Sequence, residues 1–453
     1  MDKKNLKLVS LLSLLMTTSA TSVMAEVVLN ELMPCNISSY RGSDTNYSGW
    51  VELYNDGDAK VDIKGYVFKN LKKGGSEKWS WTVSQSCVVQ PDDYAICIFD
   101  EKEKNGSAPY KLDPDGGTLI LYNASGKEIG SLKYGAMVPH ISYGIDDEGN
   151  LGYMEPTPKK DNTTAYASLG SRCGKPVFGT QPGIVDGPVS LTITSTTSEA
   201  KIYYTLDGSE PSDKNGTLYD KPIEIKRQDD QKSIVVRARA IKKGLLSSAV
   251  MTGSYIFMDD KHKNCNGFTV PIVSLAISKK DYSDNTYGIG VVGTNGISNP
   301  AKSCLSQSAN YNQDWMRPAN FEYIVDGKTV LSQETEVGVV GGCSRTYTVK
   351  SLKVNVSKKT GNSLLKYPFF GSKEPQEFKS LHIRNGGNGY NSFMIRDALL
   401  QEIARSMGLD CQHYQPVAYY INGEYKGMMG LRTRSNKDLV YAKYGVEDRK
   451  SVV

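Results

Sequence analysis

Short runs of alternating apolar and polar residues dominate residues 26–258. Residues 50–54 (WVELY) and 234–240 (IVVRARA) are examples, and turn formers such as residues 55–57 (NDG) separate the runs. Because successive side chains of a strand point to opposite faces, a period of two predicts β-strands. Many short strands between turns, without a helical period, predict β-sandwiches.

A polar segment rich in proline and lysine divides this region. It covers residues 156–175 and opens with the sequence PTPKK. Such a composition is typical of a linker. We therefore expect two all-β, immunoglobulin-like sandwiches, at residues 26–160 and 170–258, each folding on its own.

Residues 265–453 add helical signals to strand-like runs. Residues 391–407 place apolar side chains mostly three or four positions apart, which predicts an amphipathic helix, and Gly408 is a typical helix stop. The next strand, residues 417–421, meets Asn422-Gly423, a pair typical of a two-residue hairpin. The order of strand, helix and hairpin predicts an α+β third domain.

The first 25 residues have the pattern of a secretory signal peptide. Lysines precede a short apolar run at residues 8–16, and residues 23–25 (VMA) suit a signal peptidase. The apolar run is about half the roughly 20 residues that a membrane span needs. We expect cleavage before Glu26 and a chain without a membrane span, exported to the periplasm, the cell surface or the exterior.

Length and charge narrow the functional classes. A chain of 453 residues is expected to form roughly two to four domains. Its net charge of +5 is spread along the sequence, with no dense Lys/Arg block between aromatic residues. Nucleic-acid binding therefore has no support from the sequence.

The cysteines and histidines do not form a metal-binding pattern. There are eight cysteines without a C-x-x-C pair, and the four histidines are scattered, so no zinc site is expected. An even number of cysteines in an exported chain permits disulfides, and buried free thiols are the alternative.

Three strand motifs of the first sandwich resemble the lamin-tail domain. They are residues 28–33 (VLNELM), 49–57 (GWVELYNDG) and 61–66 (VDIKGY). The resemblance implies an immunoglobulin-like sandwich that binds a partner and performs no catalysis. Glu31 and Glu52 belong to this pattern, so we assign them no acid–base chemistry. Several nearby aspartates are interpreted as turn formers and not as a calcium cluster. They are Asp44, Asp56, Asp58 and Asp62.

The second sandwich resembles the small β-sandwich at the C-terminus of chitobiases and β-hexosaminidases. The resemblance rests on residues 203–211 (YYTLDGSEP), 218–219 (LY) and 236–240 (VRARA). In that family the sandwich accompanies a catalytic domain. A glycosidase needs two facing carboxylates on a sugar cleft. Asp207 and Glu210 share one turn, so we interpret them as turn residues and assign no hydrolytic activity.

The third domain has residues in the order that a kinase small lobe requires. Such a lobe presents a strand lysine to the nucleotide phosphates, and a helix glutamate orients that lysine. Lys353 lies on the polar face of a strand whose apolar face carries Leu352 and Val354, and Lys350 stands at the strand start. Glu402, in the predicted helix, is the natural partner of either lysine. The alternative is that these are ordinary surface charges.

An ordered set of motifs in this domain resembles the CotH (spore-coat protein H) kinase family. The motifs are residues 291–296 (VVGTNG), 341–345 (GGCSR), 350–353 (KSLK), 381–388 (LHIRNGGN), 395–399 (IRDAL) and 421–427 (INGEYKG). The resemblance implies an atypical kinase that transfers phosphate from a nucleotide, ATP with Mg²⁺ or Mn²⁺, to protein hydroxyls.

The resemblance also implies roles for individual residues. Gly341, Gly342, Ser344 and Arg345 would frame the phosphates, Lys350 or Lys353 would contact them, and Glu402 would position the lysine, with Asn385 and Arg396 in support.

Two positions depart from the family pattern. Gly389 stands where an acid is usual after Gly-Gly-Asn, and Thr433 stands where a Glu is frequent. By kinase order, the carboxylates that hold metal and orient the acceptor would follow Val453, so we assign no catalytic residue and no metal ligand and expect a partial, small-lobe domain. The alternative function is non-catalytic adhesion, in which the sandwiches bind an extracellular protein or glycan.

Overall fold

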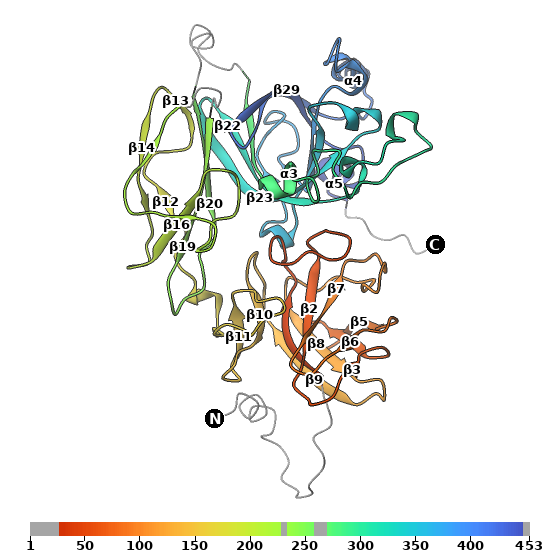
Figure 1. Ribbon diagram of the computed structural model, residues 1–453. Helices are drawn as coiled ribbons and strands as arrows, with labels where there is room; N and C mark the ends of the chain where they lie inside the picture. Colours follow the sequence, from red (N-terminus) through yellow and green to blue (C-terminus); the bar gives the residue numbers. More distant parts are fainter. Residues whose placement is uncertain (1–26, 228–232, 258–269, 447–453) are drawn as a thin grey trace, which may run out of the picture. The chain divides into compact units, whose positions relative to one another are not determined.

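The computed structural model describes residues 27–227, 233–257 and 270–446 (Figure 1). The predicted signal peptide and Cys265 lie outside these ranges. The molecule is multidomain and mostly β. It divides into two compact units, the first made of Met1–Cys173 with Lys242–Ser247 and the second of Gly174–Ile241 with Ser248–Val453. Over the described residues, no helix has the length and apolar character to cross a bilayer.

The first unit contains two antiparallel sheets around one apolar core. One sheet has the order β11-β10-β1-β2-β7 and the other β5-β4-β8-β9. Rings from both sheets meet in the core, where Phe68 lies 5.6 Å from Trp81 and 5.7 Å from Phe99 between ring centroids. The strands are β1 (Val27–Met33), β2 (Gly49–Asn55), β4 (Val67–Leu71), β5 (Glu77–Thr82), β7 (Tyr94–Phe99), β8 (Gly117–Tyr122), β9 (Glu128–Tyr134), β10 (Ser142–Ile145) and β11 (Leu151–Met154), with a small pair, β3 (Val61–Asp62) and β6 (Val88–Val89).

The start of the predicted linker is bonded to this sandwich. The backbone N–H of Thr157 donates to the Glu31 carboxylate, and that of Lys159 donates to Glu52. The Asn162 amide donates to the backbone oxygens of Asn30 and Ile145. Buried carboxyl groups need hydrogen-bond partners, and these two obtain donors from a segment whose composition alone is typical of a linker.

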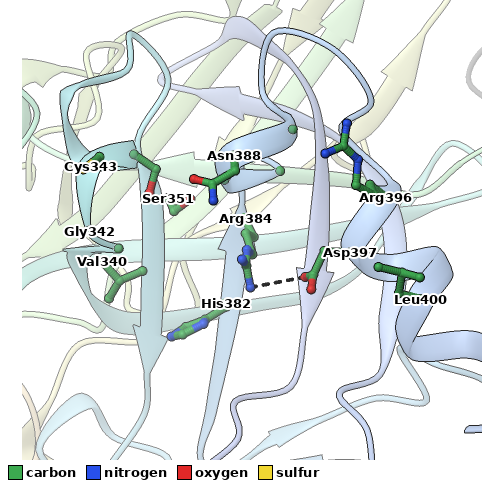
Figure 2. A pocket seen from close by; sticks show the side chains of 15 residues that line it. Val340, Gly342, Cys343, Ser351, His382, Arg384, Asn388, Arg396, Asp397 and Leu400 are labelled. Carbon is green, nitrogen blue, oxygen red and sulfur yellow. Dashed lines mark ion pairs between the residues drawn. The ribbon is translucent and has the colours of Figure 1, made fainter. Parts of the chain in front are cut away.

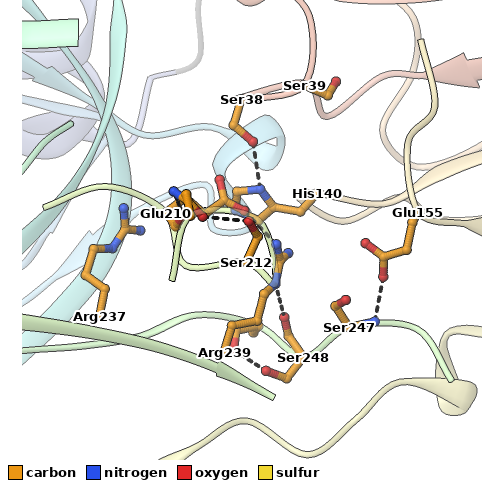
Figure 3. A network of polar contacts seen from close by, with 12 residues as sticks. Ser38, Ser39, His140, Glu155, Glu210, Ser212, Arg237, Arg239, Ser247 and Ser248 are labelled. Atoms are coloured by element: carbon orange, nitrogen blue, oxygen red, sulfur yellow. Dashed lines mark hydrogen bonds and ion pairs between the residues drawn. The ribbon is translucent and has the colours of Figure 1, made fainter. Parts of the chain in front are cut away.

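Residues 242–250 connect two strands of the second unit, and the boundary between the units falls after Ser247. In the first unit, the Ser247 N–H donates to Glu155 (2.6 Å), and the Arg172 guanidinium donates to the Ser247 carbonyl. In the second unit, Arg239 donates to the Ser248 carbonyl (3.0 Å) and pairs with Glu210 at 2.7 Å (Figure 3). Glu210 is thus an ion-pair partner of a buried arginine as well as a turn residue.

The second unit is built on a twelve-stranded sheet. Its order is β17-β16-β19-β20-β13-β23-β22-β21-β28-β29-β27-β24, and β24 also pairs with β23. That last pairing closes the seven strands from β23 to β24 into a barrel. The strands are β13 (Gly183–Val185), β16 (Lys201–Thr205), β17 (Thr217–Leu218), β19 (Ser233–Ile241), β20 (Met251–Phe257), β21 (Ile272–Ala276), β22 (Arg317–Val325), β23 (Lys328–Val340), β24 (Ser351–Asn355), β27 (Ser380–Arg384), β28 (Tyr414–Ile421) and β29 (Glu424–Arg432).

The described residues of this unit also form three further two-strand pairs and several short helices. The pairs are β12 (Val177–Phe178) with β15 (Ile193–Thr194), β14 (Val189–Leu191) with β18 (Ile223–Ile225), and β25 (Leu365–Lys366) with β26 (Glu377–Phe378). The α-helices are α3 (Lys279–Tyr282), α4 (Arg396–Ser406) and α5 (Lys437–Tyr444).

The barrel core explains the alternation in its strands. Leu352 and Val354 of β24, and Leu381 and Ile383 of β27, are buried in one cluster with apolar residues from the other barrel strands. Their neighbours in sequence, including Lys353 and His382, therefore lie on the outer face. The outer face carries the polar chemistry of this region.

Two local predictions can be compared with the structure directly. The hairpin is confirmed, because Asn422 (φ 48°) and Gly423 (φ 83°) connect β28 to β29 with the positive φ values that such a turn requires. The predicted helix is present as α4, but it begins at Arg396, after a 3₁₀ turn at Gly387–Gly389. Its side chains Leu400 and Ile403 are 60% and 50% exposed.

Candidate anion-binding pocket

A pocket of about 470 Å³ lies on the outer face of the barrel, between two glycine turns and the start of α4 (Figure 2). One turn follows β23 and the other follows β27. The residues that line it are Val340, Gly341, Gly342, Cys343, Ser344, Ser351, His382, Arg384, Gly386, Gly387, Asn388, Gly389, Arg396, Asp397 and Leu400.

Both turns require glycine. Gly341 (φ +113°) and Gly386 (φ +80°) have left-handed backbone conformations that other residues rarely adopt. A Cβ at Gly341 would approach the Ser344 hydroxyl oxygen to 2.4 Å. The pocket wall is therefore backbone at these points, which allows a ligand to come close to it.

Several contacts fix the first glycine turn. Arg345 donates from Nε to the Gly341 carbonyl (2.8 Å) and from Nη1 to the Tyr311 carbonyl (2.9 Å). A disulfide joins Cys343 to Cys304. Among the other described cysteines, Cys87, Cys97 and Cys411 are free thiols, so both expected cysteine states are present.

A buried asparagine holds the second turn against β24. Asn385 donates from Nδ2 to the Val349 carbonyl (2.7 Å), its N–H donates to the Ser351 hydroxyl, and its side-chain oxygen accepts from the Gly387 N–H. Next to it, the rings of Tyr347 and Tyr390 stack with centroids 4.7 Å apart. The two turns are thus connected at one end of the pocket.

Basic side chains dominate the electrostatics of the pocket. Arg384 Nη1 lies 3.4 Å from the Asp397 carboxylate, and Arg432 also pairs with that carboxylate. Burial alone would raise the pKa of Asp397, but the two arginines hold it below its ordinary value. Arg396 also lines the pocket, is exposed, and has no ion-pair partner among the described residues.

A row of basic residues crosses three strands beside the pocket. His382 of β27 lies directly opposite Lys353 of β24 on one side and Arg432 of β29 on the other. Burial, followed by the charges of Arg434, Arg384, Lys353 and Arg432, lowers the pKa of His382 to about 4. The imidazole is therefore neutral at pH 7, within a cationic environment.

The structure brings together only part of the predicted site. Gly341, Gly342 and Ser344 line the pocket, whereas Arg345 supports the turn behind it. The Lys350 ammonium donates to the Tyr347 carbonyl (2.6 Å) and lies over the Tyr311 ring. Burial lowers the pKa of Lys350 to about 8.

The expected lysine–glutamate pair is not present in the described part of the chain. Lys353 pairs with Asp314 at 2.7 Å. Glu402 lies 3.4 Å from Arg405 on the same helix. The nucleotide-contacting roles given to these residues stay predictions.

Three ionisable side chains of the pocket received no role from the sequence. They are His382, Arg384 and Asp397. Alternation in the motif LHIRN does place His382 and Arg384 on the face opposite Leu381 and Ile383, so this signal was available. Asp397 could not be assigned, because its two arginine partners come from distant strands.

The pocket does not supply a ligand set for a divalent metal. Within the described ranges, no group of three or more His, Cys, Asp or Glu side chains could hold an ion. Of the described residues that line the pocket, Asp397 alone is a carboxylate, and two arginines bind it. Mg²⁺ and Mn²⁺ prefer several oxygen ligands, so we derive no step through a metal.

Three parts of the chain match known protein families. Residues 337–453 match the CotH kinase protein family. The chain carries a CotH kinase domain. Its described part is mostly strands with few helices, and the pocket lies within it. Residues 20–136 match the Lamin Tail Domain, and residues 191–255 match the Fn3-associated family. The lamin-tail and CotH resemblances are confirmed, whereas the chitobiase-type relation of the second module stays a prediction.

Similarity to solved structures is remote. The fibronectin(III)-like modules of Clostridium thermocellum CbhA share 10% identity over 47% of this chain and 87% of theirs, with a TM-score of 0.15. The sialic acid binding region of a Streptococcus sanguinis SK1 adhesin shares 11% identity over 74% of this chain and 94% of its own, with a TM-score of 0.14. Scores this low support no argument. No curated protein matches the sequence.

Proposed function

We propose that the CotH kinase domain binds the phosphate groups of a nucleotide in the pocket on the outer face of the barrel. The observation that carries this proposal is the combination, around one cavity, of two glycine turns with Arg384 and with Arg396, which has no ion-pair partner in the described part of the chain. Family membership of the domain suggests nucleotide use. Phosphate oxygens suit both the backbone of glycine turns and guanidinium groups.

Each group has a separate part in this proposal. Arg396 is the first cation that an incoming phosphate meets, because it is exposed and has no carboxylate partner in the described structure. Arg384 Nη1 lies 3.4 Å from the Asp397 carboxylate, so the guanidinium can exchange this carboxylate for a bound phosphate. Arg432 remains on Asp397 and keeps that carboxylate ionised. Asp397 therefore acts as a positioning residue and not as a general base.

We also propose, from the family, that the bound nucleotide donates phosphate to a protein hydroxyl. In this proposal the described residues bind and orient the phosphates. Their role is the same whichever residue accepts the proton of the acceptor hydroxyl. Export of the chain is a further proposal. Its supports are the signal-like N-terminus and the Cys304–Cys343 disulfide, a bond that is typical of oxidising compartments.

Calorimetric titration in the presence of EDTA tests phosphate recognition from the side of the ligand. ATP and tripolyphosphate should bind with affinities within about tenfold of each other, and adenosine should bind at least about a hundredfold more weakly, because charged hydrogen bonds supply most of the free energy. Binding of adenosine without binding of tripolyphosphate would overturn the proposal.

A further inference from the structure

His382 differs both from a core histidine with hydrogen-bonded ring nitrogens and from a histidine that pairs with a carboxylate. It lines the cavity, and its Nε2 atom is buried without a hydrogen-bond partner in the described structure. A buried polar atom without a partner is costly and calls for an explanation. Figure 2 shows His382 and Arg384 on the same strand, with Arg384 directed to Asp397.

Charged groups from both neighbouring strands, from β27 itself and from the residues after β29 surround His382. Lys353 and Arg432 are its cross-strand neighbours, Arg384 is two positions along β27, and Arg434 follows β29. On β23, the residue opposite Lys353 is Gly338, which adds no charge. The carboxylates nearby are already bound, Asp397 by two arginines and Asp314 by Lys353.

This arrangement disfavours a proton on His382 only while the pocket lacks an anion. The surrounding cations and burial lower the pKa of His382 to about 4. An anion in the same cavity would offset part of this positive charge and offer an acceptor to the ring. The imidazole would then take one proton from solvent and donate it, as a charged hydrogen bond, to the anion.

We propose that His382 is a proton-linked ligand of the pocket, which binds an anion oxygen as imidazolium and so couples anion binding to the uptake of a proton. The proposal rests on the anion-binding role of the pocket. It also predicts a ligand preference. Between pH 5 and pH 7, the pocket favours an anion that stays fully deprotonated while the proton binds to the protein. An anion that binds the imidazolium form more tightly raises the population of that form, so anion binding and protonation are linked.

Sulfate is the appropriate probe, because it does not titrate between pH 5 and pH 7. Its affinity for the full chain, measured by calorimetry, should rise roughly tenfold from pH 7 to pH 5 if bound sulfate raises the pKa of His382 by about two units. Titrations at pH 5.5 in two buffers of different ionisation enthalpy should show net proton uptake on binding.

Two variants separate the proposal from a structural role of the side chain. His382→Gln keeps an amide donor but cannot titrate, so its ratio of affinities at pH 5 and pH 7 should be close to one, with no proton uptake. His413→Gln alters a buried histidine that pairs with Glu374 and does not line the pocket, so it should keep the wild-type ratio. Melting curves check that both variants fold, and comparing ratios removes any uniform loss of affinity.

The outcomes distinguish this inference from the proposed function. If sulfate binds at both pH values with equal affinity and without proton uptake, His382 is not proton-linked, although the pocket still binds anions. If His382→Gln retains the full pH dependence, another group carries the proton and the inference is wrong. If sulfate, tripolyphosphate and ATP all fail to bind, the anion-binding role itself is wrong.

Discussion

Glu31 lies directly opposite Glu52 on neighbouring strands β1 and β2, and both carboxyl groups are fully buried. Burial, together with the charge of Glu52, raises the pKa of Glu31 to about 8. The two groups hold Thr157 and Lys159 of the following segment by hydrogen bonds from backbone N–H groups. The connection after the lamin-tail domain is therefore fixed to the sheet at its start.

This pair predicts that the first unit loses stability as the pH rises from about 4.5 to about 8. Because the folded-state pKa of Glu31 is raised, its contribution is complete below the unfolded value of 4.5 and is lost as the pH rises through about 8. One proton corresponds to about 1.4 kcal/mol per pH unit within this window. Urea unfolding between pH 5 and pH 8, followed by tryptophan fluorescence, measures it, since Trp50, Trp79 and Trp81 lie in this unit.

The matched variants for this prediction are Glu31→Gln and Glu128→Gln. Glu31→Gln should flatten the dependence of unfolding free energy on pH, because an amide cannot titrate. Glu128 is exposed on β9, so its change to Gln should leave the slope as in the wild type. An unchanged slope in Glu31→Gln would assign the pH dependence to another group.

A buried ion pair predicts that the Fn3-associated module and the barrel strands depend on one another. Arg237 of β19 lies 2.5 Å from Glu334 of β23, and both side chains are largely buried. Glu334→Ala would leave the arginine without its partner, so we expect a loss of about 3 kcal/mol in the unfolding free energy of the second unit. Glu224→Ala, which breaks an exposed pair with Lys226, should change it by less than about 0.5 kcal/mol. Equal effects of the two changes in denaturant titrations would contradict this dependence.

The disulfide predicts weaker anion binding once it is removed. Cys343 lies in the pocket wall, and its bond to Cys304 restrains the first glycine turn. In a Cys304→Ser/Cys343→Ser double variant the turn must be ordered on binding, at a cost of about 1 kcal/mol, or roughly fivefold in tripolyphosphate affinity. Cys411→Ser removes a free thiol and serves as the control. Full affinity in the double variant would show that Arg345 alone holds the turn.

Much of the local structure could be predicted from the sequence, and the closure of the barrel could not. The alternation at Leu352 and Val354 and the Asn422-Gly423 turn are local signals, and both gave the correct result. The pairing of β24 with β23 and the row from Lys353 to Arg432 join distant parts of the chain. No local period contains such pairings, so the basic row beside the pocket became visible only in the fold.

The lysine partners show the same limit. The kinase-like order of strand and helix predicts that Glu402 pairs with Lys350 or Lys353, but in the structure Lys353 pairs with Asp314 and Glu402 with Arg405. A double-mutant cycle of Lys353→Ala and Glu402→Ala on the unfolding free energy should therefore show a coupling below about 0.3 kcal/mol. A coupling above about 1 kcal/mol would favour the pair that the sequence predicts.

The most direct measurement of the central claim is the tripolyphosphate affinity of Arg396→Ala beside that of Arg227→Ala. Arg396 lines the pocket without a carboxylate partner in the described structure, whereas Arg227 is an exposed arginine of the Fn3-associated module. If the pocket binds nucleotide phosphates, Arg396→Ala should lose at least about tenfold in affinity, as expected for a charged hydrogen bond, and Arg227→Ala should stay within about twofold of the wild type. Equal affinities of both variants and the wild type would contradict the assignment of this pocket.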